Sequence, residues 1–329
     1  YGETVFIYDG DINYFLRLID AIEESKCDGV KFQMLLKKED AYCQSAPNFD
    51  KIDHLLFSYD EWEEILQYAK KKGLDVIILP IDLASADFCL ENLELFDAIE
   101  IHSICCNDYF IIKKISKINQ KIIILGTGGR TIEDINFALK YLGKDKQVIL
   151  MHGFQSFPTS IEDINLGKLT ILKDEYQLPL GYTDHSAHMG DIGIDLIKFS
   201  YLLGARIFEK HITLHKGEKR IDYSSAVNKG DMKKIREELH ELIRFVGQDH
   251  KFQLNVAEIK YRNREKQLVW AHNIKKGKII QFNDLHFKVT KGKSDFEQKQ
   301  LFDIINSKAS KLLKKDNVVK KCDIMEKLE

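Results

Sequence analysis

The chain has 329 residues, of which 44% are hydrophobic and 30% are charged, and its formal net charge is -2. This length allows one large domain and one small domain. The near-neutral charge gives no reason to expect nucleic acid or an anionic membrane as a partner, and no apolar run reaches the roughly 18 residues of a transmembrane helix.

Eight short, apolar segments are the candidate strands, and each is followed by a helical pattern. Continuous apolar runs of this kind are typical of strands buried on both faces of a parallel sheet. Eight strand–helix units over about 245 residues match a (β/α)8 TIM barrel. An open doubly wound sheet is the alternative, which we disfavour because the count reaches eight without leftover strands. The segments cover residues 4–8, 29–33, 74–80, 98–103, 121–127, 148–153, 178–184 and 205–212.

The helix between the second and third predicted strands has the clearest pattern. Ser58 and Glu61 match a capping box, and Gly73 is placed to end the helix. The predicted apolar face consists of Trp62, Ile65, Leu66 and Ala69. Similar N-terminal signals, at Thr131 with Asp134 and at Ser160 with Asp163, predict the starts of two later helices.

A polar segment interrupts the strand–helix alternation and predicts a domain boundary. We place a barrel domain at residues 1–246, a linker at residues 247–266 and a small domain at residues 267–329. Short apolar runs, a Lys-Lys-Gly turn and little helical pattern predict that the small domain is rich in β structure. We interpret its lysine-rich stretch, residues 308–321, as a solvated face rather than a binding patch.

The six cysteines are scattered along the chain, and none forms a Cys-x-x-Cys pair. Isolated cysteines with mostly apolar neighbours are typical of reduced core thiols. The sequence therefore predicts a cytoplasmic protein.

Polar residues close several predicted strands, at the end of a barrel where active sites lie. His185 follows the seventh strand, and Glu209 and His211 lie in the eighth. Two neutral imidazoles on adjacent strands can bind a divalent transition ion and leave positions open for water and substrate. Glu209 points to the same side of its strand as His211. The alternative is that both histidines are hydrogen-bonded core residues, but histidines and acids grouped at one end favour the metal site.

Lys31 is a charged residue inside an apolar strand. Because a buried lysine is rare without a partner, we expect an anionic ligand such as phosphate or carboxylate. The alternative is a lysine paired with a core carboxylate. The turn at residues 127–129 opens a helix, and its free N–H groups could bind an anion, although many strand-to-helix turns share this feature.

Ordered motifs along nearly the whole chain carry a family resemblance. Gly181-Tyr182-Thr183-Asp184-His185-Ser186 is close to Gly-Tyr-Ser-Asp-His-Thr, and Glu209-Lys210-His211-Ile212-Thr213-Leu214 is close to Glu-Lys-His-Phe-Thr-Leu. Further matches lie at residues 28–33, 126–129, 151–166 and 274–285. On these motifs the chain resembles the sialic acid synthase family, which includes the pseudaminic and legionaminic acid synthases. The resemblance identifies the small domain as an antifreeze-like (SAF) domain.

The resemblance implies a transferase that condenses phosphoenolpyruvate with an N-acylated mannosamine-type amino sugar, giving a nonulosonic acid and phosphate. A divalent ion, Mn²⁺ or Mg²⁺, would be held by His185 and His211 and would polarise the sugar aldehyde. Catalytic roles would belong to Glu3, Lys31, Glu209 and Asp222. Substrate contacts would come from Lys31, Ser103, Thr127, Gln155, Phe157, Thr183, Asp184 and Asp222. In the family the antifreeze-like domain reaches over a partner's barrel, which implies a domain-swapped homodimer.

Several positions of the family's site hold different residues here. Glu100 stands where the family has a phosphate-binding lysine, a charge reversal that would repel an anionic substrate. Cys105 stands at the place of a catalytic glutamate, whose acid–base role a cysteine cannot reproduce. Further departures from the family pattern are Ile7, Tyr8, Leu79, Gly126, Gln155 and Val289.

The metal half of the predicted site is thus kept, and the phosphoenolpyruvate half is largely rewritten. Three functions stay open, because the fold does not choose among them. The chain could be a synthase whose anion contacts have moved, with His102 and Lys31 supplying positive charge. It could instead bind a sugar or a metal without catalysing this condensation, or serve as a dimeric scaffold or regulatory partner of an active synthase.

Overall fold

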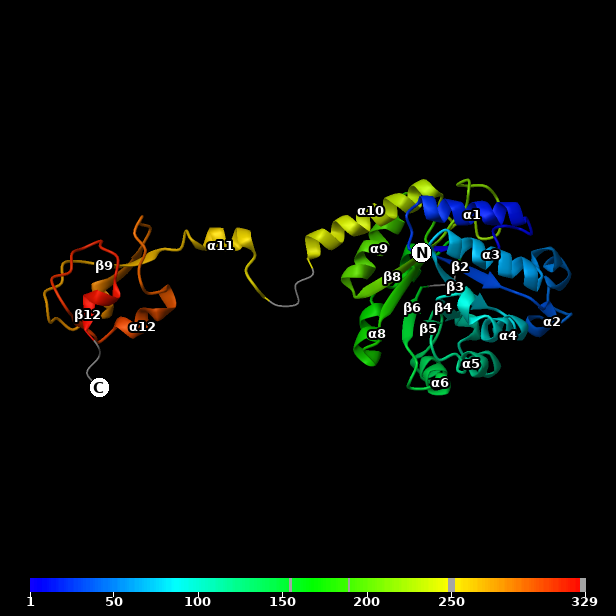
Figure 1. Cartoon of the computed structure of the whole chain (residues 1–329), viewed down its shortest axis with the longest axis horizontal. Helices are drawn as coiled ribbons and strands as arrows, with labels where there is room; N and C mark the ends of the chain where they lie inside the picture. The colour runs from blue at the N-terminus through cyan, green and yellow to red at the C-terminus, as the bar shows by residue number, and fades with distance from the viewer. Residues whose placement is uncertain (154–155, 189, 248–251, 326–329) are drawn as a thin grey trace. The chain divides into compact units, whose positions relative to one another are not determined.

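The structure is a computed structural model that describes residues 1–153, 156–188, 190–247 and 252–325. Contacts divide the chain into two compact units, Tyr1–Gly247 and Gln248–Glu329. In the first unit, helices surround a closed ring of strands (Figure 1).

Eight parallel strands form the ring, and β1 pairs with both β2 and β8 to close it. This confirms the predicted (β/α)8 barrel. The strands are β1 (Gly2–Glu3), β2 (Gly29–Met34), β3 (Asp75–Pro80), β4 (Ala98–Ile101), β5 (Ile122–Gly126), β6 (Val148–His152), β7 (Leu180–Asp184) and β8 (Ala205–His211).

The first strand ends before the segment predicted for it, residues 4–8. Val5 and Asp9 adopt left-handed backbone conformations, with φ angles of 45° and 51°, so the chain turns directly after β1. The apolar residues of this segment are buried for a different reason. The ring of Tyr8 is fully buried and stacks on Phe15 with ring centroids 4.2 Å apart. Its hydrophobicity therefore reflects packing in the loop after β1 rather than strand pairing.

Helices cover the outside of the barrel (Figure 1). The capping boxes predicted at Ser58 and Thr131 are confirmed at the starts of α3 and α6. Ser160 begins only the four-residue α7 and makes no side-chain cap hydrogen bond. The helices of this unit are α1 (Ile12–Glu24), α2 (Lys38–Ala41), α3 (Tyr59–Lys71), α4 (Leu83–Glu91), α5 (Tyr109–Ile115), α6 (Ile132–Leu142), α7 (Ile161–Ile164), α8 (Lys168–Tyr176), α9 (Ile192–Leu202) and α10 (Lys229–Val246).

Alternate residues of the strands point into the barrel, and they form layers of different chemistry. The lower layer is an apolar cluster of Ile77, Ala98, Ile124, Ile149 and Met151. Lys31, Glu100 and Glu209 lie in a buried, charged layer, in which Glu100 follows Ala98 by two residues on β4. The charged layer therefore rests on an apolar floor, at the end of the barrel where the strands finish.

The second unit is a small structure of short strands. Antiparallel β9 (Gln267–Trp270) pairs with β10 (Leu285–Lys288), and β11 (Lys308–Ala309) pairs with β12 (Ile324–Met325). The unit also contains α11 (Val256–Arg262) and α12 (Leu301–Ile304). The side chain of Trp270 is fully buried in its apolar core.

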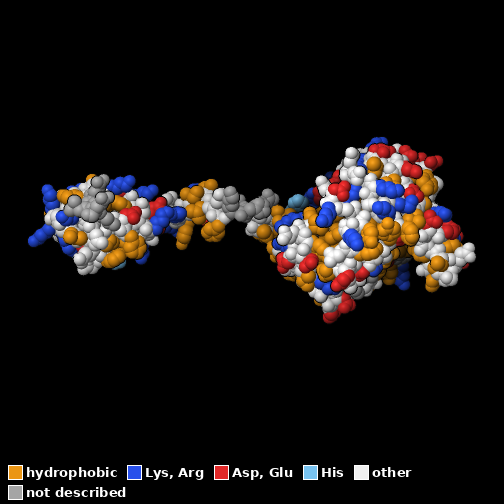
Figure 2. Space-filling model, turned by 90° about the horizontal axis from the view of Figure 1, so that it is seen from below, with side chains coloured by type: hydrophobic (Ala, Val, Ile, Leu, Met, Phe, Trp, Pro, Cys, Tyr) orange, Lys and Arg blue, Asp and Glu red, His pale blue; other side chains and the backbone are white. Residues whose placement is uncertain are grey.

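Two features of the second unit bear on the sequence analysis. Helix α11 lies within the residues predicted as a linker, and none of its side chains is buried. Lys and Arg side chains stand out on the surface of the unit in Figure 2. Most lysines of the 308–321 stretch are exposed, as expected for a solvated face.

Among the described residues, no helix combines the length and the apolar character needed to cross a membrane. All six cysteines are free thiols in the described structure. Cys43 and Cys322 are exposed, so the prediction that the cysteines are core thiols is wrong for these two.

Candidate active site

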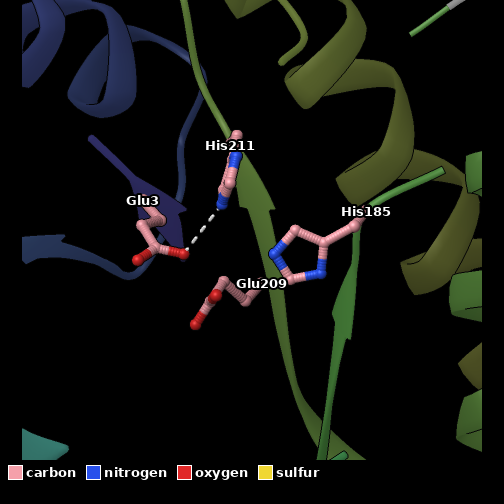
Figure 3. Close-up of side chains that lie close together, drawn as sticks. All are labelled: Glu3, His185, Glu209 and His211. Atoms are coloured by element: carbon pink, nitrogen blue, oxygen red, sulfur yellow. Dashed lines mark hydrogen bonds and ion pairs between the residues drawn. The ribbon is translucent and has the colours of Figure 1, made fainter. Parts of the chain in front are cut away.

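Four buried side chains converge at the end of the barrel where the strands finish (Figure 3). Glu3, His185, Glu209 and His211 each offer a ligand atom, and these atoms all lie within 4.8 Å of one another. Glu3 on β1 is the register neighbour of His211 on β8. The predicted closeness of the two histidines is therefore confirmed. The cluster also includes the two carboxylates, for which the family resemblance predicts catalytic roles rather than metal ligation.

Both histidines are held in the neutral form that binds metals. Burial lowers the pKa of His211 to about 4 and holds the pKa of His185 well below its usual value. In the described part of the chain, the buried Nδ1 atoms of both rings have no hydrogen-bond partner. The Nε2 atom of His211 lies 3.1 Å from Oε2 of Glu3. Two imidazole nitrogens and two carboxylate oxygens form a donor set that fits a divalent transition ion.

Lys31 points into the barrel, but it is not free to meet an anion. Its ammonium group lies 3.2 Å from the carboxylate of Glu3, 3.2 Å from that of Glu100 and 2.8 Å from that of Glu209. All four side chains are at least 95% buried. The alternative interpretation, a lysine paired with core carboxylates, is therefore the correct one. The prediction of a direct phosphoenolpyruvate contact is not supported by this geometry.

Glu100 is a partner of Lys31 rather than a charge that faces the substrate. Burial raises the pKa of Glu100 to about 8, and burial also raises the pKa of Glu3. Against the effect of burial, the Lys31 ammonium group holds the pKa of Glu209 well below its usual range. A divalent cation bound beside these carboxyl groups would favour their ionised form, so its binding would release protons from them.

Three other predicted residues lie next to the cluster. The hydroxyl of Thr183 donates to Oε1 of Glu209 at 2.7 Å. The ring centroid of Phe157 lies 5.1 Å from that of His185 and 5.8 Å from that of His211. Asp222 is close enough to His211 for its charge to oppose the lowering of the imidazole pKa. These side chains surround the two imidazoles and one of the carboxylates.

Asp184 does not lie in the cluster, and the prediction that it contacts the substrate is wrong. Strand alternation places Thr183 inside the barrel and Asp184 on the outer face of β7. There its fully buried carboxylate accepts from Nζ of Lys210 at 2.7 Å and from the backbone and hydroxyl of Ser186. Its Oδ2 atom would lie only 2.8 Å from a Cβ added at Gly193, so it faces α9. Asp184 thus anchors the segment that carries His185.

Ser103 and Thr127, the substrate contacts predicted after β4 and β5, are already engaged or crowded within the protein. The hydroxyl of Thr127 donates to the carbonyl oxygen of Met151 at 3.1 Å, so its hydrogen is already used. Ser103 is buried, and its backbone N would lie 2.8 Å from a Cβ added at Gly126. A serine at position 126 would therefore require this backbone to shift. Gln155 lies outside the described residues.

The remaining departures from the family pattern lie in different surroundings, some in the core and one on the surface. Tyr8 donates its buried hydroxyl to the carbonyl oxygen of Leu55, and Leu79 is fully buried. Burial raises the pKa of the Cys105 thiol to about 12, so it is protonated at neutral pH. Val289 belongs to the second unit, where it is 80% exposed.

The place of Glu3 and Glu209 among the candidate metal ligands and the pairing of Glu100 with Lys31 were not predicted from the sequence. A signal was present for Glu209, because it lies two residues before His211 and therefore on the same strand face. A signal also existed for Glu100, since Lys31 and Glu100 are opposite charges inside otherwise apolar strands. Strand β1 has only two residues, too few to show an alternating pattern, so no such signal was available for Glu3.

His152 provides a pH-dependent test of the fold outside the cluster. Burial lowers its pKa to about 4, whereas an exposed histidine titrates near 6.5. The unfolded chain therefore binds this proton at a higher pH than the folded chain does. The contribution of neutral His152 to the free energy of unfolding is fully present above pH 6.5. It is lost as the pH falls towards 4, and the loss is about 3 kcal/mol at most. We expect His152→Gln to flatten the pH dependence of urea unfolding in this window, and an unchanged profile would contradict the assignment.

Comparisons with known proteins identify the relatives of this chain. The model of the NeuB family matches residues 18–251. An uncharacterized protein of Methanocaldococcus jannaschii is 28% identical over 327 residues, covering 97% of this chain and 94% of the relative. The N,N'-diacetyllegionaminic acid synthase of Campylobacter jejuni is 28% identical over 296 residues, covering 84% and 86%. The crystal structure of an N-acetylneuraminic acid synthetase from Leptospira borgpetersenii, 24% identical, has a TM-score of 0.71 and covers 80% of this chain and 90% of that one, which supports the fold.

Proposed function

The chain belongs to the NeuB family, and on this basis we propose that it is a metal-dependent synthase that condenses phosphoenolpyruvate with an N-acylated mannosamine-type amino sugar. The products would be a nonulosonic acid and phosphate. The observation that carries the proposal is the buried set of two histidines and two glutamates at the end of the barrel. The likeness to a diacetyllegionaminic acid synthase supports the substrate class.

Glu3, His185, Glu209 and His211 would hold manganese or magnesium. When bound, the ion supplies a Lewis acid that polarises the carbonyl group of the open-chain sugar. Mixed nitrogen and oxygen donors favour manganese over magnesium, which prefers oxygen ligands. Because burial keeps both imidazoles neutral, no proton has to leave them before binding.

The residues around the cluster have roles that follow from their contacts. Thr183 and Lys31 orient the Glu209 carboxylate and keep it ionised. Phe157 packs against both imidazole rings, which restricts water on that side. Asp222 is half-buried near His211 and would accept a hydrogen bond from a sugar hydroxyl. Lys31 is a positioning residue in this scheme, since its charge is used within the protein.

A second candidate function is favoured by one observation. Cys105 stands where the family has its catalytic glutamate, and its buried thiol is protonated at neutral pH. Such a group does not accept a proton as a carboxylate would. A chain with an intact metal cluster and no acid–base residue at this position would bind a sugar or a metal without turnover, alone or as a partner of an active synthase.

Phosphate release from phosphoenolpyruvate tests the proposed function directly. We expect release that depends on both Mn²⁺ and an N-acylated amino sugar, measured across a panel of such sugars. A chelator should stop the reaction, and added Mn²⁺ should restore it, because the cluster offers the only described group of histidines and acids that could hold an ion.

The assay also separates the two candidates. Sugar-dependent release identifies a synthase, and the preferred sugar names its substrate. A protein that binds Mn²⁺ but releases no phosphate with any sugar would contradict the synthase and support the binding function.

We also propose that residues 267–329 form the antifreeze-like domain and that two chains exchange these domains in a homodimer. The small β-rich architecture of the second unit supports the first part. The second part rests on the family resemblance.

A further inference from the structure

The site described above lacks a cation that can bind an anionic substrate. Lys31 is surrounded by three carboxylates, and Glu100 replaces the second lysine expected from the family pattern. The Lys31 ammonium group is already paired with carboxylates of the protein, so it offers no uncompensated charge to a phosphate group. A synthase of this class therefore needs a positive charge elsewhere at the same end of the barrel.

Arg130 is such a charge. It lies in the turn after β5, where its backbone N donates to the carbonyl oxygen of Thr127 at 3.1 Å. Its Nε atom is buried and has no hydrogen-bond partner, and no ion pair of the guanidinium group occurs within the described ranges. A buried, unpartnered guanidinium nitrogen is costly, and arginine is the side chain best suited to bind a phosphate through several hydrogen bonds.

The neighbouring loop places a second donor near Arg130. The segment after β4 packs against the start of α6, where Cys106 approaches the carbonyl oxygen of Asp134 and Asn107 contacts its side chain. His102, at the start of this segment, accepts the backbone N–H of Ile104 at its Nδ1 atom, 3.1 Å away. In the neutral ring the hydrogen must then lie on Nε2, which becomes a donor.

His102 is close enough to both Lys31 and Arg130 for their charges to act on its ring. Burial lowers its pKa to about 4, and the positive charges of Lys31 and Arg130 act in the same direction. The imidazole is therefore neutral at neutral pH, and it donates a hydrogen bond without adding a charge. The charge of Arg130 also acts on the Cys105 thiol, and the ends of β4 and β5 approach closely, since a Cβ added at Gly126 would lie 2.8 Å from the backbone N of Ser103.

We propose that Arg130 and His102 form an anion subsite between the ends of β4 and β5 that binds the phosphate group of the substrate. The inference rests on the proposed function for the identity of that substrate. The phosphate group is carried by phosphoenolpyruvate or by a phosphorylated amino sugar. Arg130 supplies the charge and two or more N–H donors, and Nε2 of His102 supplies one further donor.

Calorimetric titration with phosphoenolpyruvate tests the subsite without requiring turnover. Loss of a charge-assisted hydrogen-bond partner costs about 1.5–3 kcal/mol, so we expect Arg130→Gln to weaken binding by roughly 10- to 100-fold. Arg130→Lys should recover part of the affinity, since it keeps the charge but loses the planar donor set. Arg244→Gln, at an exposed position on α10, is the matched control and should bind as the wild type does.

Two controls make the result specific. The affinity for Mn²⁺ should be unchanged in Arg130→Gln, because Arg130 contributes no atom to the cluster. The midpoint of urea unfolding should also stay within error of the wild type, since the buried Nε atom of Arg130 has no hydrogen-bond partner to lose.

Steady-state kinetics then distinguish the sources of the phosphate group. A higher KM for phosphoenolpyruvate assigns the subsite to that substrate, whereas a higher KM confined to phosphorylated sugars assigns it to the sugar. Arg130-dependent binding of phosphoenolpyruvate without any phosphate release would support the subsite and contradict the synthase. Unchanged phosphoenolpyruvate and sugar kinetics in Arg130→Gln would overturn the subsite and leave the synthase intact. If the wild type bound neither phosphoenolpyruvate nor inorganic phosphate, the subsite would likewise be overturned.

Discussion

Replacing Lys31 with methionine is expected to lower the free energy of unfolding by about 3–5 kcal/mol, the usual cost of removing one partner from a buried ionic group. The ammonium group lies within 3.2 Å of three buried carboxylates. Without it, the protein must either keep unpaired negative charge in a low-dielectric interior or bind additional protons. Methionine keeps most of the volume of the side chain, so the change reports charge more than packing.

Urea unfolding at pH 8 in the presence of a chelator measures this effect, since the carboxylates are then most ionised and no metal compensates them. Lys234→Met is the matched control, because Lys234 pairs with Asp191 at 2.8 Å with both side chains more than half exposed. Such a pair contributes at most about 1 kcal/mol. Adding Glu100→Leu to Lys31→Met should restore part of the stability, because one of the three carboxylates is removed. Equal unfolding midpoints for Lys31→Met and Lys234→Met would show that the carboxylates are not ionised together.

Replacing His185 or His211 with alanine is expected to weaken Mn²⁺ binding by at least about 100-fold. Changes to residues that only support a ligand already cost 10- to 100-fold in metal affinity, and these substitutions remove a donor atom itself. The remaining carboxylates would still attract a cation, but they supply no imidazole nitrogen. Phosphate release should fall with the metal affinity if the chain is a synthase.

Titration of free Mn²⁺ by electron paramagnetic resonance measures the loss directly. His240→Ala is the control, since His240 is exposed on α10 and outside the cluster. When the free Mn²⁺ concentration is 100 times the dissociation constant, binding should add about 2.7 kcal/mol to the free energy of unfolding of the wild type. This added stability should be absent from the two cluster variants. Full Mn²⁺ affinity in both variants would place the ion elsewhere in the protein.

The parts of the site that the sequence predicted are those that depend on strand alternation and on fold class. In a parallel barrel all strands finish at the same end, so residues at strand ends meet there whatever their distance along the chain. His185 and His211 come together for this reason. Period-two alternation also placed Glu209 beside His211. The same rule, applied to Thr183 and Asp184, assigns only the first to the interior, so the error over Asp184 was avoidable.

The partners of Lys31 required the tertiary structure. A buried charge predicts that a partner exists, but both a ligand and a protein carboxylate satisfy this requirement, and the sequence contains both possibilities. Only the closed barrel places Glu3, Glu100 and Glu209, from three different strands, around one ammonium group. Glu100, which from the sequence alone would be expected to repel the substrate, is instead a partner of Lys31 within the protein.

The sequence by itself determined the barrel, the small β-rich unit and the family, because apolar periodicity and ordered motifs are local properties of the chain. It also indicated that His185 and His211 could bind a metal. The tertiary structure decided which charges are already paired, which side chains face outwards, and that Arg130 keeps a buried nitrogen without a partner. These outcomes depend on distances between strands and loops that are far apart in the chain, and no local pattern encodes those distances.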